Sequence, residues 1–428
     1  MTSAGGAGIG VRGPRGFLTP YAEIFAIPRA WRFSVAGIIG RMPMSMYGLG
    51  TVLLISAGTG RYGLAGSVSA AGSIGGAVCA PQFGRLTDRI GQHRVLIPVC
   101  LTFTLSVAGL AAAVTLHAPD WTLFLCGITG GATMPQTGPM ARARWSVLLA
   151  GSPRLHTAFS LESVADEVCF VLGPAAVTVL ATQVHPAAGV TSAALCALLG
   201  SLWFASQRST EPPVTVVPEA SESQSGPPRL AARGRRLAAP GLIVLVPMYL
   251  FLGAMFVGVD LSTVAFATHF GHKALAGFIL GCYALGSGLG GLWYGSRTWR
   301  APASRRLAVT LPLTVAGVCT FWAMPNLLVL TPVIFLCGMT IAPTLIAGFS
   351  LLESTALPGR TTEAMAWLST GISVGVACGS TAAGFVLDAF GARWGYAFAA
   401  AAGVTAALIY LGGLRRVSAA PAAADVPA

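Results

Sequence analysis

Twelve long apolar segments constrain the fold of this chain more than any other feature. A helix that spans a lipid bilayer needs roughly 20 mostly apolar residues, and each segment is close to that length or longer. Because the bilayer core has no water to satisfy backbone polar groups, such segments are expected to be helical. The segments lie near residues 33–56, 62–83, 95–116, 121–141, 157–181, 186–206, 242–267, 275–296, 307–324, 327–350, 363–387 and 393–414. The sequence therefore predicts an all-α integral membrane protein with twelve transmembrane helices.

The basic residues predict how these helices are oriented. The chain has 26 Lys and Arg against 14 Asp and Glu, a net charge of +12. With both termini in the cytoplasm, the inside segments hold 22 of the 26 basic residues, which agrees with the positive-inside rule. The outside loops hold Arg61, Lys273 and Arg393, and Arg41 lies inside the first helix. We therefore expect a multi-pass protein of the cell membrane whose charge sets its topology and does not bind nucleic acid.

The cysteines predict neither disulfides nor a metal site. All nine lie within apolar segments, and no two form a C-x-x-C pair. They are expected to be small apolar residues in helix packing. No metal, no cofactor and no catalytic residue is expected.

The chain divides into two halves that resemble each other. Seven residues of the first half recur in the second at an offset of 211, and four more recur at an offset of 206. Between the halves, a stretch rich in Pro, Ser, Glu and Arg is typical of a flexible linker. We expect five regions: an N-terminal cytoplasmic tail over 1–30, six-helix bundles over 31–206 and 241–414, a cytoplasmic linker over 207–240 and a disordered tail over 415–428.

A compact charged loop separates the second and third apolar segments. The loop reads Gly84-Arg85-Leu86-Thr87-Asp88-Arg89-Ile90-Gly91-Gln92-His93-Arg94. It fits a G-x-x-x-D-R-x-G pattern followed by a basic residue, and the matching residues are Gly84, Asp88, Arg89, Gly91 and Arg94. That pattern marks the loop between helices 2 and 3 in the major facilitator superfamily, where arginine or lysine is usual at the positions of Gln92 and His93. The second half has Trp299 at the position of Asp88.

Over residues 30–415 the chain resembles this superfamily, in particular its bacterial drug:proton antiporters. The resemblance implies two pseudo-symmetric six-helix bundles that rock about a site near the membrane midplane. It also implies that Asp88 closes the cytoplasmic side by holding the start of helix 11. Thr361-Thr362-Glu363 is typical of a helix start, where a carboxylate is favoured. In the alternative interpretation the loop only orients the chain.

The fifth segment carries three acidic residues, Glu162, Asp166 and Glu167. Each costs roughly 2.5 to 3.5 kcal/mol near the bilayer centre unless it faces a partner or water. Glu162 and Asp166 share a helix face, and Glu167 lies about 100° away from Asp166. Crowded carboxylates in a low dielectric bind protons readily, so proton coupling is one interpretation. A buried ion pair is the other.

Arg41 is the expected partner of that pair. It lies about eight residues into the first segment, near 12 Å at 1.5 Å per residue, and the acidic residues enter the fifth segment to a similar depth from the same side. The alternative is that Arg41 extends to the cytoplasmic interface. The arginine usual in helix 4 of the superfamily is missing from residues 126–138, which makes Arg41 the expected substitute.

Two further features of the apolar segments are candidates for function. Gly173-Pro174 in the fifth segment resembles the core of a motif found in drug:proton antiporters, and Pro174 is expected to bend the helix. A generic membrane-helix kink is the alternative. Asp260 is the acidic residue deep in the seventh segment, where a lone carboxylate is a substrate or proton candidate. A hydrogen bond to a neighbouring helix would also explain it.

Together these features predict a secondary active transporter, not an enzyme. The leading hypothesis is efflux of a small molecule in exchange for protons, by a monomer that alternates access across the bilayer. An importer of a metabolite or sugar is the alternative within transport. A membrane sensor and a membrane enzyme are more distant alternatives, because the sequence has neither a large soluble domain nor a nucleophile and base in a recognisable arrangement.

Overall fold

The computed structural model describes residues 19–152, 154–214, 240–272, 275–356 and 359–418. The terminal residues 1–18 and 419–428, and residues 215–239 of the expected linker, lie outside the described residues. The disorder predicted there and the placement of the tails therefore stay predictions.

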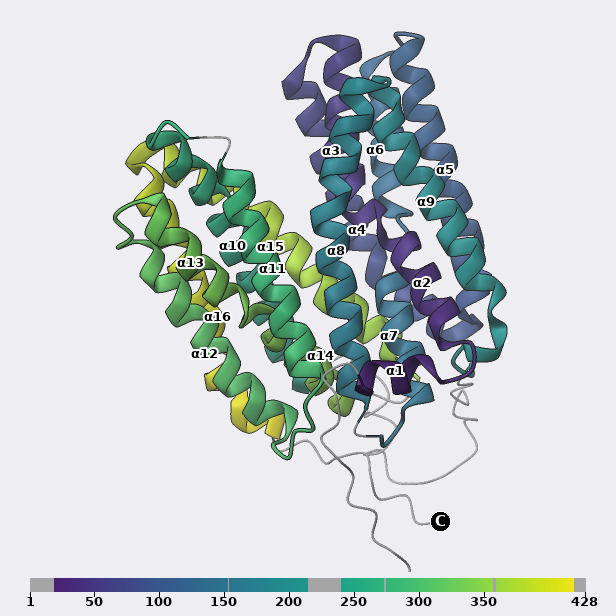
Figure 1. Cartoon of the computed structure of the whole chain (residues 1–428). Helices are drawn as coiled ribbons and strands as arrows, with labels where there is room; N and C mark the ends of the chain where they lie inside the picture. The colour runs from purple at the N-terminus through teal and green to yellow at the C-terminus, as the bar shows by residue number, and fades with distance from the viewer. Residues whose placement is uncertain (1–18, 153, 215–239, 273–274, 357–358, 419–428) are drawn as a thin grey trace, which may run out of the picture.

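Helices form the N-terminal half of the described chain. They are α1 (Thr19–Phe25), α2 (Ala30–Arg41), α3 (Pro43–Thr59), α4 (Tyr62–Ile90), α5 (Gln92–Thr115), α6 (Asp120–Ala132), α7 (Thr137–Leu148), α8 (Leu155–Gln183) and α9 (Pro186–Ser206), followed by the short 3₁₀ helix η1 (Arg208–Thr210). The short helix α1 falls within the region expected to be a tail, and it packs against α8 and α2 (Figure 1).

The C-terminal half repeats this arrangement. Its helices are α10 (Pro240–His269), α11 (Leu275–Gly295), α12 (Ala303–Phe321), α13 (Leu327–Gly338), α14 (Ile341–Thr355), α15 (Thr361–Phe390) and α16 (Ala392–Ser418). The repeat is also visible in the packing. Gly75 of α4 lies against the carbonyl of Ile128 in α6, and Gly286 of α11 lies against the carbonyl of Phe335 in α13.

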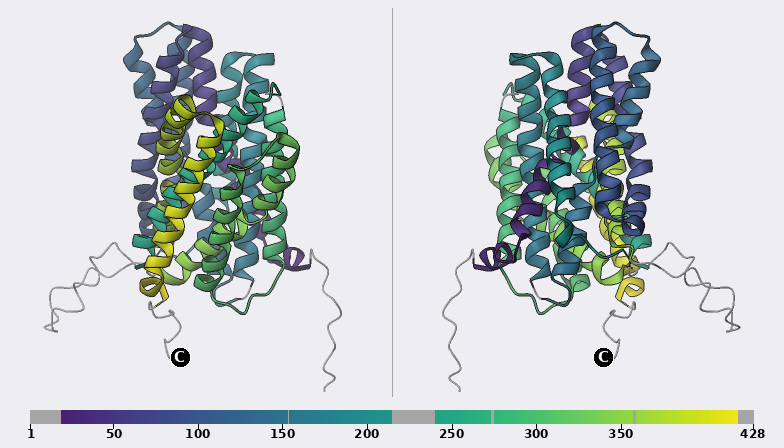
Figure 2. Two further views of the ribbon diagram at one scale, coloured as in Figure 1. Left: turned by 90° about the vertical axis from the view of Figure 1, so that its left-hand side faces the viewer. Right: turned by 90° about the vertical axis from the view of Figure 1, so that its right-hand side faces the viewer.

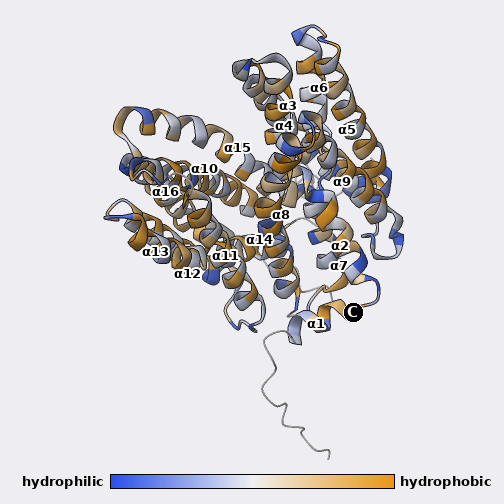
Figure 3. Cartoon of the chain, turned by 45° about the horizontal axis from the view of Figure 1, so that its top comes forward, coloured by the Kyte–Doolittle hydropathy of each residue, from blue (hydrophilic) through white to orange (hydrophobic). Residues whose placement is uncertain are grey.

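Ten spans of the described chain are long and apolar enough to cross a membrane. Two of these ten are the interrupted pairs α2 with α3 and α13 with α14. The pair α6 with α7 and the helix α12, which carries Arg305 and Arg306 near its start, complete twelve spans. Hydrophobic residues cover the helices along their length in Figure 3, and hydrophilic ones gather towards the helix ends. The fold is that of an all-α membrane protein with two six-helix bundles.

The fourth span is longer than the sequence predicted. It was expected to end at residue 141, but after a break at residues 133–136 it continues as α7 to Leu148. Pro135 explains the break, because proline has no N–H to donate and disfavours helix at the preceding residue. Arg142 and Arg144, expected in an inside loop, therefore lie in a helix and are buried. Residues 126–138 carry no arginine, but the span continues through α7, which carries these two.

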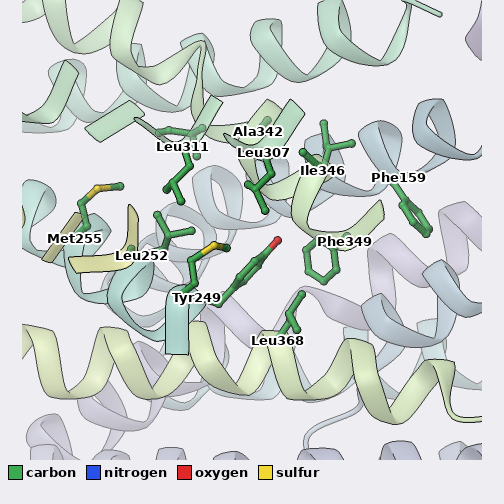
Figure 4. Close-up of a cluster of buried hydrophobic side chains, with 14 of the residues drawn as sticks. Phe159, Tyr249, Leu252, Met255, Leu307, Leu311, Ala342, Ile346, Phe349 and Leu368 are labelled. Carbon is green, nitrogen blue, oxygen red and sulfur yellow. The ribbon is translucent and has the colours of Figure 1, made fainter. Parts of the chain in front are cut away.

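The two halves meet at one end of the molecule, which we call the α1 end. Figure 1 shows the bundles converging there and diverging towards the opposite end, and the side views of Figure 2 show α1 at that same end. The largest buried apolar cluster joins the halves, since it includes Phe159 of α8 as well as Ile346 and Phe349 of α14 (Figure 4). A second cluster, around Tyr47 and Leu110 towards the opposite end, contains residues of the N-terminal half only. The structure is therefore packed shut at the α1 end.

Candidate functional site

The charged loop of the sequence, residues 84–94, contacts the start of α15. The expectation of a loop over this whole segment is wrong, because α4 continues to Ile90 and α5 begins at Gln92, with only Gly91 between them. The backbone N–H groups of Thr362 and Glu363 donate to the two carboxylate oxygens of Asp88, at 3.2 and 2.9 Å. A side chain at Gly84 would bring its Cβ to 2.9 Å from the Cα of Glu363, so glycine is needed for this approach. A carboxylate on free N–H groups at a helix start is favoured by hydrogen bonding and by the helix dipole. The contact joins the two halves at the α1 end.

The basic residues of the same loop make no such contact. Arg89 and Arg94 are exposed, and neither forms a hydrogen bond or ion pair within the described part of the chain. Gly91 has φ of 99°, a left-handed conformation that favours glycine and lets α5 begin directly after α4. In this structure the charged loop joins the two halves through the carboxylate of Asp88. Arg89 takes no part in that contact.

The first residues of the expected linker pack on this loop. Glu211 accepts from the backbone N–H of His93 at 3.1 Å and contacts the His93 ring at 2.9 Å. Arg144 of α7 donates to the carbonyl of Gln207 and to the hydroxyl of Thr210. Residues 207–211 thus pack on the folded bundle in this structure, and the bounds of the linker stay a prediction.

The helix α1 also bridges the two halves. The hydroxyl of Tyr21 donates to the carbonyl of Leu292 in α11 at 2.7 Å and lies 3.1 Å from the hydroxyl of Ser160 in α8. Ser160 in turn donates to the carbonyl of Gly291. This contact could not be expected from the sequence, because α1 is only seven residues long and lies in a region with the composition of a tail.

Four charged residues form what we call the ion-pair cluster: Arg41, Arg142, Glu162 and Asp166. The guanidinium of Arg41 donates to a carboxylate oxygen of Glu162 and, at 2.8 Å, to Asp166. Arg142 donates to the other oxygen of Asp166 at 2.6 Å. Arg41 lies at the end of α2, is only 2% exposed and does not extend to the surface. Two cations face two anions, so the cluster is neutral.

Neighbouring groups complete the hydrogen bonding of the cluster. The indole N–H of Trp145 donates to Glu162 at 2.9 Å. The guanidinium of Arg142 lies over the ring of Phe349 in α14, 4.2 Å from its centroid. The cluster thus connects α2, α7 and α8 of one half with α14 of the other. Sequence reasoning missed Arg142 because it placed this residue in a loop.

Glu167 and Asp260, which we call the unpaired carboxylates, differ from the cluster. Glu167 accepts from the hydroxyl of Ser287 in α11 at 2.7 Å. Asp260 lies in α10, which packs against α11. Neither carboxylate forms an ion pair within the described residues. One comes from each half, and α8 and α11 are adjacent (Figure 1).

Gly173 and Pro174 lie inside α8, which is assigned as one helix throughout. Gly173 packs against the side chains of Ser45 and Met46 in α3. One turn earlier, the hydroxyl of Ser45 donates to the carbonyl of Cys169 at 2.7 Å. The glycine is therefore explained by close packing of α8 on α3, and a role in bending stays a prediction.

Comparison with known proteins decides the family. The sequence matches the description Major Facilitator Superfamily over residues 33–356 and, in a second match, over 243–427. The chain belongs to the major facilitator superfamily. It is therefore a multi-pass membrane transporter of the alternating-access type, in a family of transporters and not of enzymes. The comparison with curated proteins gave no match.

Solved structures of several named transporters are similar to this one. A bacterial homologue of the iron transporter ferroportin, outward-facing with soaked iron, has a TM-score of 0.68 at 14% identity, over 90% of this chain and 98% of that one. FucP in the outward conformation has a TM-score of 0.67 at 15% identity, over 90% and 99%. The human organic anion transporter MFSD10 (TETRAN) has a TM-score of 0.64 at 18% identity, over 90% and 100%. At these identities the likeness concerns the fold alone.

Proposed function

We propose that this transporter exports a small molecule in exchange for protons, and that the unpaired carboxylates carry the protons. The observation that carries the proposal is the position of Glu167 and Asp260, which come from different halves and have no cationic partner within the described residues. In a low dielectric such a carboxylate binds a proton more readily than one held by a guanidinium. The ion-pair cluster then stays charged and keeps α2, α7 and α8 together.

The α1 end is proposed to be the cytoplasmic side of the cell membrane. Support comes from the basic residues, which concentrate in loops on the side of both termini. In that orientation the contacts of Asp88 with α15 and of Tyr21 with α11 close the cytoplasmic side, and the protein faces outward. Opening the α1 end requires both contacts to break.

The direction of transport is proposed from a motif in α8. The Gly173-Pro174 pair resembles a motif of drug:proton antiporters, which favours export. One observation favours the alternative of proton-coupled import, because a structural neighbour at 16% identity is the fucose:proton symporter FucP of E. coli. Both hypotheses require a carboxylate that binds and releases protons.

A pH-gradient assay in inverted membrane vesicles tests the proposal. Compounds from a panel are added to vesicles that hold an acidic interior, and release of the gradient is followed with a pH-sensitive dye. A transported compound is expected to dissipate the gradient with wild-type protein but not with Glu167→Gln or Asp260→Asn. The matched control is Asp388→Asn, an exposed carboxylate near the end of α15. If both variants exchange protons at the wild-type rate, the assignment is wrong.

A further inference from the structure

The loop between α11 and α12 is the counterpart of the charged loop in the other half. It lies at the α1 end, because α1 contacts the last turn of α11. At the offset of 211 that relates the halves, Trp299 stands at the position of Asp88, and α12 begins at Ala303, the counterpart of Gln92 in α5. Residues 293–306 contain no acidic residue and four arginines, Arg297, Arg300, Arg305 and Arg306. The second half therefore has a purely basic loop at this end.

The two equivalent helix starts differ in what meets their backbone N–H groups. At the start of α5, the N–H of His93 donates to the carboxylate of Glu211 at 3.1 Å. At the start of α12, the N–H groups of Ala303, Ser304 and Arg305 donate to no acceptor within the described residues. Free N–H groups and the helix dipole favour an anion at such a place. The start of α12 thus lacks the negative group that its counterpart has.

The arginines of this loop lie among exposed aromatic rings. The guanidinium of Arg306 donates to the hydroxyl of Tyr294 at 2.9 Å, and the Tyr294 ring stacks on Trp299 with the centroids 4.8 Å apart. The guanidinium of Arg297 lies over the Trp293 ring, 5.5 Å from its centroid. In the part of the chain that the structure describes, none of the four arginines forms an ion pair. Their positive charge is therefore not neutralised there.

Exposed apolar faces of two helices lead to this loop. On α12, Arg305, Val309 and Leu313 are four residues apart and share one face. Val309 and Leu313 are 62% and 56% exposed, as expected of side chains that face lipid acyl chains. On α11, Leu289 and Trp293 are also four residues apart, and they are 43% and 44% exposed. Both faces end in aromatic or basic residues, which are typical of the level of the lipid headgroups.

We propose that residues 296–306, which we call the arginine loop, bind the headgroup of an anionic phospholipid in the leaflet at the α1 end. The lipid phosphate accepts from the N–H groups at the start of α12, in the place that the carboxylate of Glu211 has at the start of α5. The exposed side chains of Arg300 and Arg305 add positive charge around it.

A lipid suits this place better than a soluble anion or another segment of the chain. Its acyl chains can lie along the exposed apolar face of α12, next to the headgroup site. Residues 215–239, which lie outside the described residues, carry two acidic and four basic residues, so their net charge does not complement the arginine loop. The inference requires only that the α1 end lies at a membrane interface, and it is independent of the direction and coupling of transport.

Native mass spectrometry of the purified full-length protein, with lipid titrated into the detergent solution, tests this inference. The probes are phosphatidylglycerol, phosphatidylcholine with the same acyl chains, and inorganic phosphate. Phosphatidylglycerol is expected to bind about tenfold more tightly than phosphatidylcholine, and added salt is expected to reduce this preference. Arg300→Gln combined with Arg305→Gln is expected to abolish the preference, because these two arginines supply most of the exposed charge.

Hydrogen exchange followed by mass spectrometry locates the headgroup. In nanodiscs that contain phosphatidylglycerol, exchange at the start of α12 is expected to be slower than in nanodiscs of phosphatidylcholine alone, because the phosphate protects the free N–H groups. Exchange at the start of α5 is expected to be the same in both, since Glu211 already accepts there.

The matched control removes the same charge from the other half. Arg89→Gln combined with Arg94→Gln changes two exposed arginines at the same end and is expected to keep the preference for phosphatidylglycerol. Thermal unfolding curves show whether each variant is folded.

Four results would overturn the inference. They are equal binding of the two lipids, a preference that survives in the Arg300→Gln, Arg305→Gln variant, an equal loss of preference in the control, and unaltered exchange at the start of α12. Displacement of phosphatidylglycerol by inorganic phosphate at millimolar concentration would also overturn it, because the site would then belong to a soluble anion.

Discussion

Asp166 and Glu167 are neighbours in one helix, yet their surroundings differ completely. Asp166 accepts from Arg41 at 2.8 Å and from Arg142 at 2.6 Å. Glu167, turned by about 100°, has no cationic partner within the described residues and accepts there only from the hydroxyl of Ser287. The comparison teaches that an acidic residue in a membrane helix is not functional by residue type alone. Its partners separate a structural ion pair from a site that binds protons or substrate.

The largest expected effect follows from removing one charge of the ion-pair cluster, to which Asp166 belongs. Arg41→Met leaves Glu162, which is fully buried, without its cation, and breaking a buried pair typically costs about 3 to 5 kcal/mol. We expect a large fall in thermal stability and in the yield of monodisperse protein, measured by thermal unfolding and size-exclusion chromatography.

A double variant sharpens that prediction. Arg41→Met combined with Glu162→Gln removes both charges and keeps an acceptor for the Trp145 indole, so much of the lost stability is expected to return. Wild-type stability in the single variant would contradict a structural role for the ion-pair cluster.

An effect of intermediate size is expected for Asp88, whose carboxylate accepts from backbone N–H groups and not from a guanidinium. Asp88→Asn replaces one of the acceptors of Thr362 and Glu363 and is expected to weaken the contact by about 1 to 3 kcal/mol. Hydrogen exchange followed by mass spectrometry should then show faster exchange at the start of α15, while the middle of α10 is unchanged. Unaltered exchange at Thr362 and Glu363 would mean that Asp88 does not hold the α1 end closed.

The smallest effect is expected for an exposed pair. Arg61 donates to both oxygens of Asp120 at 3.0 and 2.8 Å, but the two side chains are 60% and 49% exposed. Exposed pairs are typically worth less than about 1 kcal/mol. Asp120→Asn is therefore expected to leave the unfolding temperature and proton exchange almost unchanged. A loss as large as that of Arg41→Met would show that burial is not what separates these pairs.

Much of the fold followed from the sequence, because long apolar runs and the distribution of basic residues depend on local composition. Counting residues from the loops placed Arg41 at the depth of the carboxylates of α8, and the structure has them in hydrogen-bond contact. The meeting of Asp88 with the start of α15 followed from the resemblance to the superfamily. The roles given to these residues stay predictions.

What the sequence did not reveal depends on tertiary partners. Arg142 lies just beyond the predicted fourth apolar segment, where an arginine is typical of a loop. Its charge is accommodated in a membrane helix because Asp166 and Phe349 lie beside it. The buried hydroxyl of Tyr283 in α11 has no hydrogen-bond partner among the described residues. This could not be foreseen, because an aromatic residue at helical spacing is usually a packing residue. The short helix α1 became recognisable only through the contact of Tyr21 with α11.

The central claim is that the unpaired carboxylates carry the protons that are exchanged for the transported compound. Titration calorimetry of a compound that dissipates the vesicle gradient, in two buffers of different ionisation enthalpy, measures the protons released per bound molecule. The account predicts proton release from the wild-type protein and from Asp388→Asn, and a clear reduction in Glu167→Gln and in Asp260→Asn. The same proton release in all four proteins would contradict it.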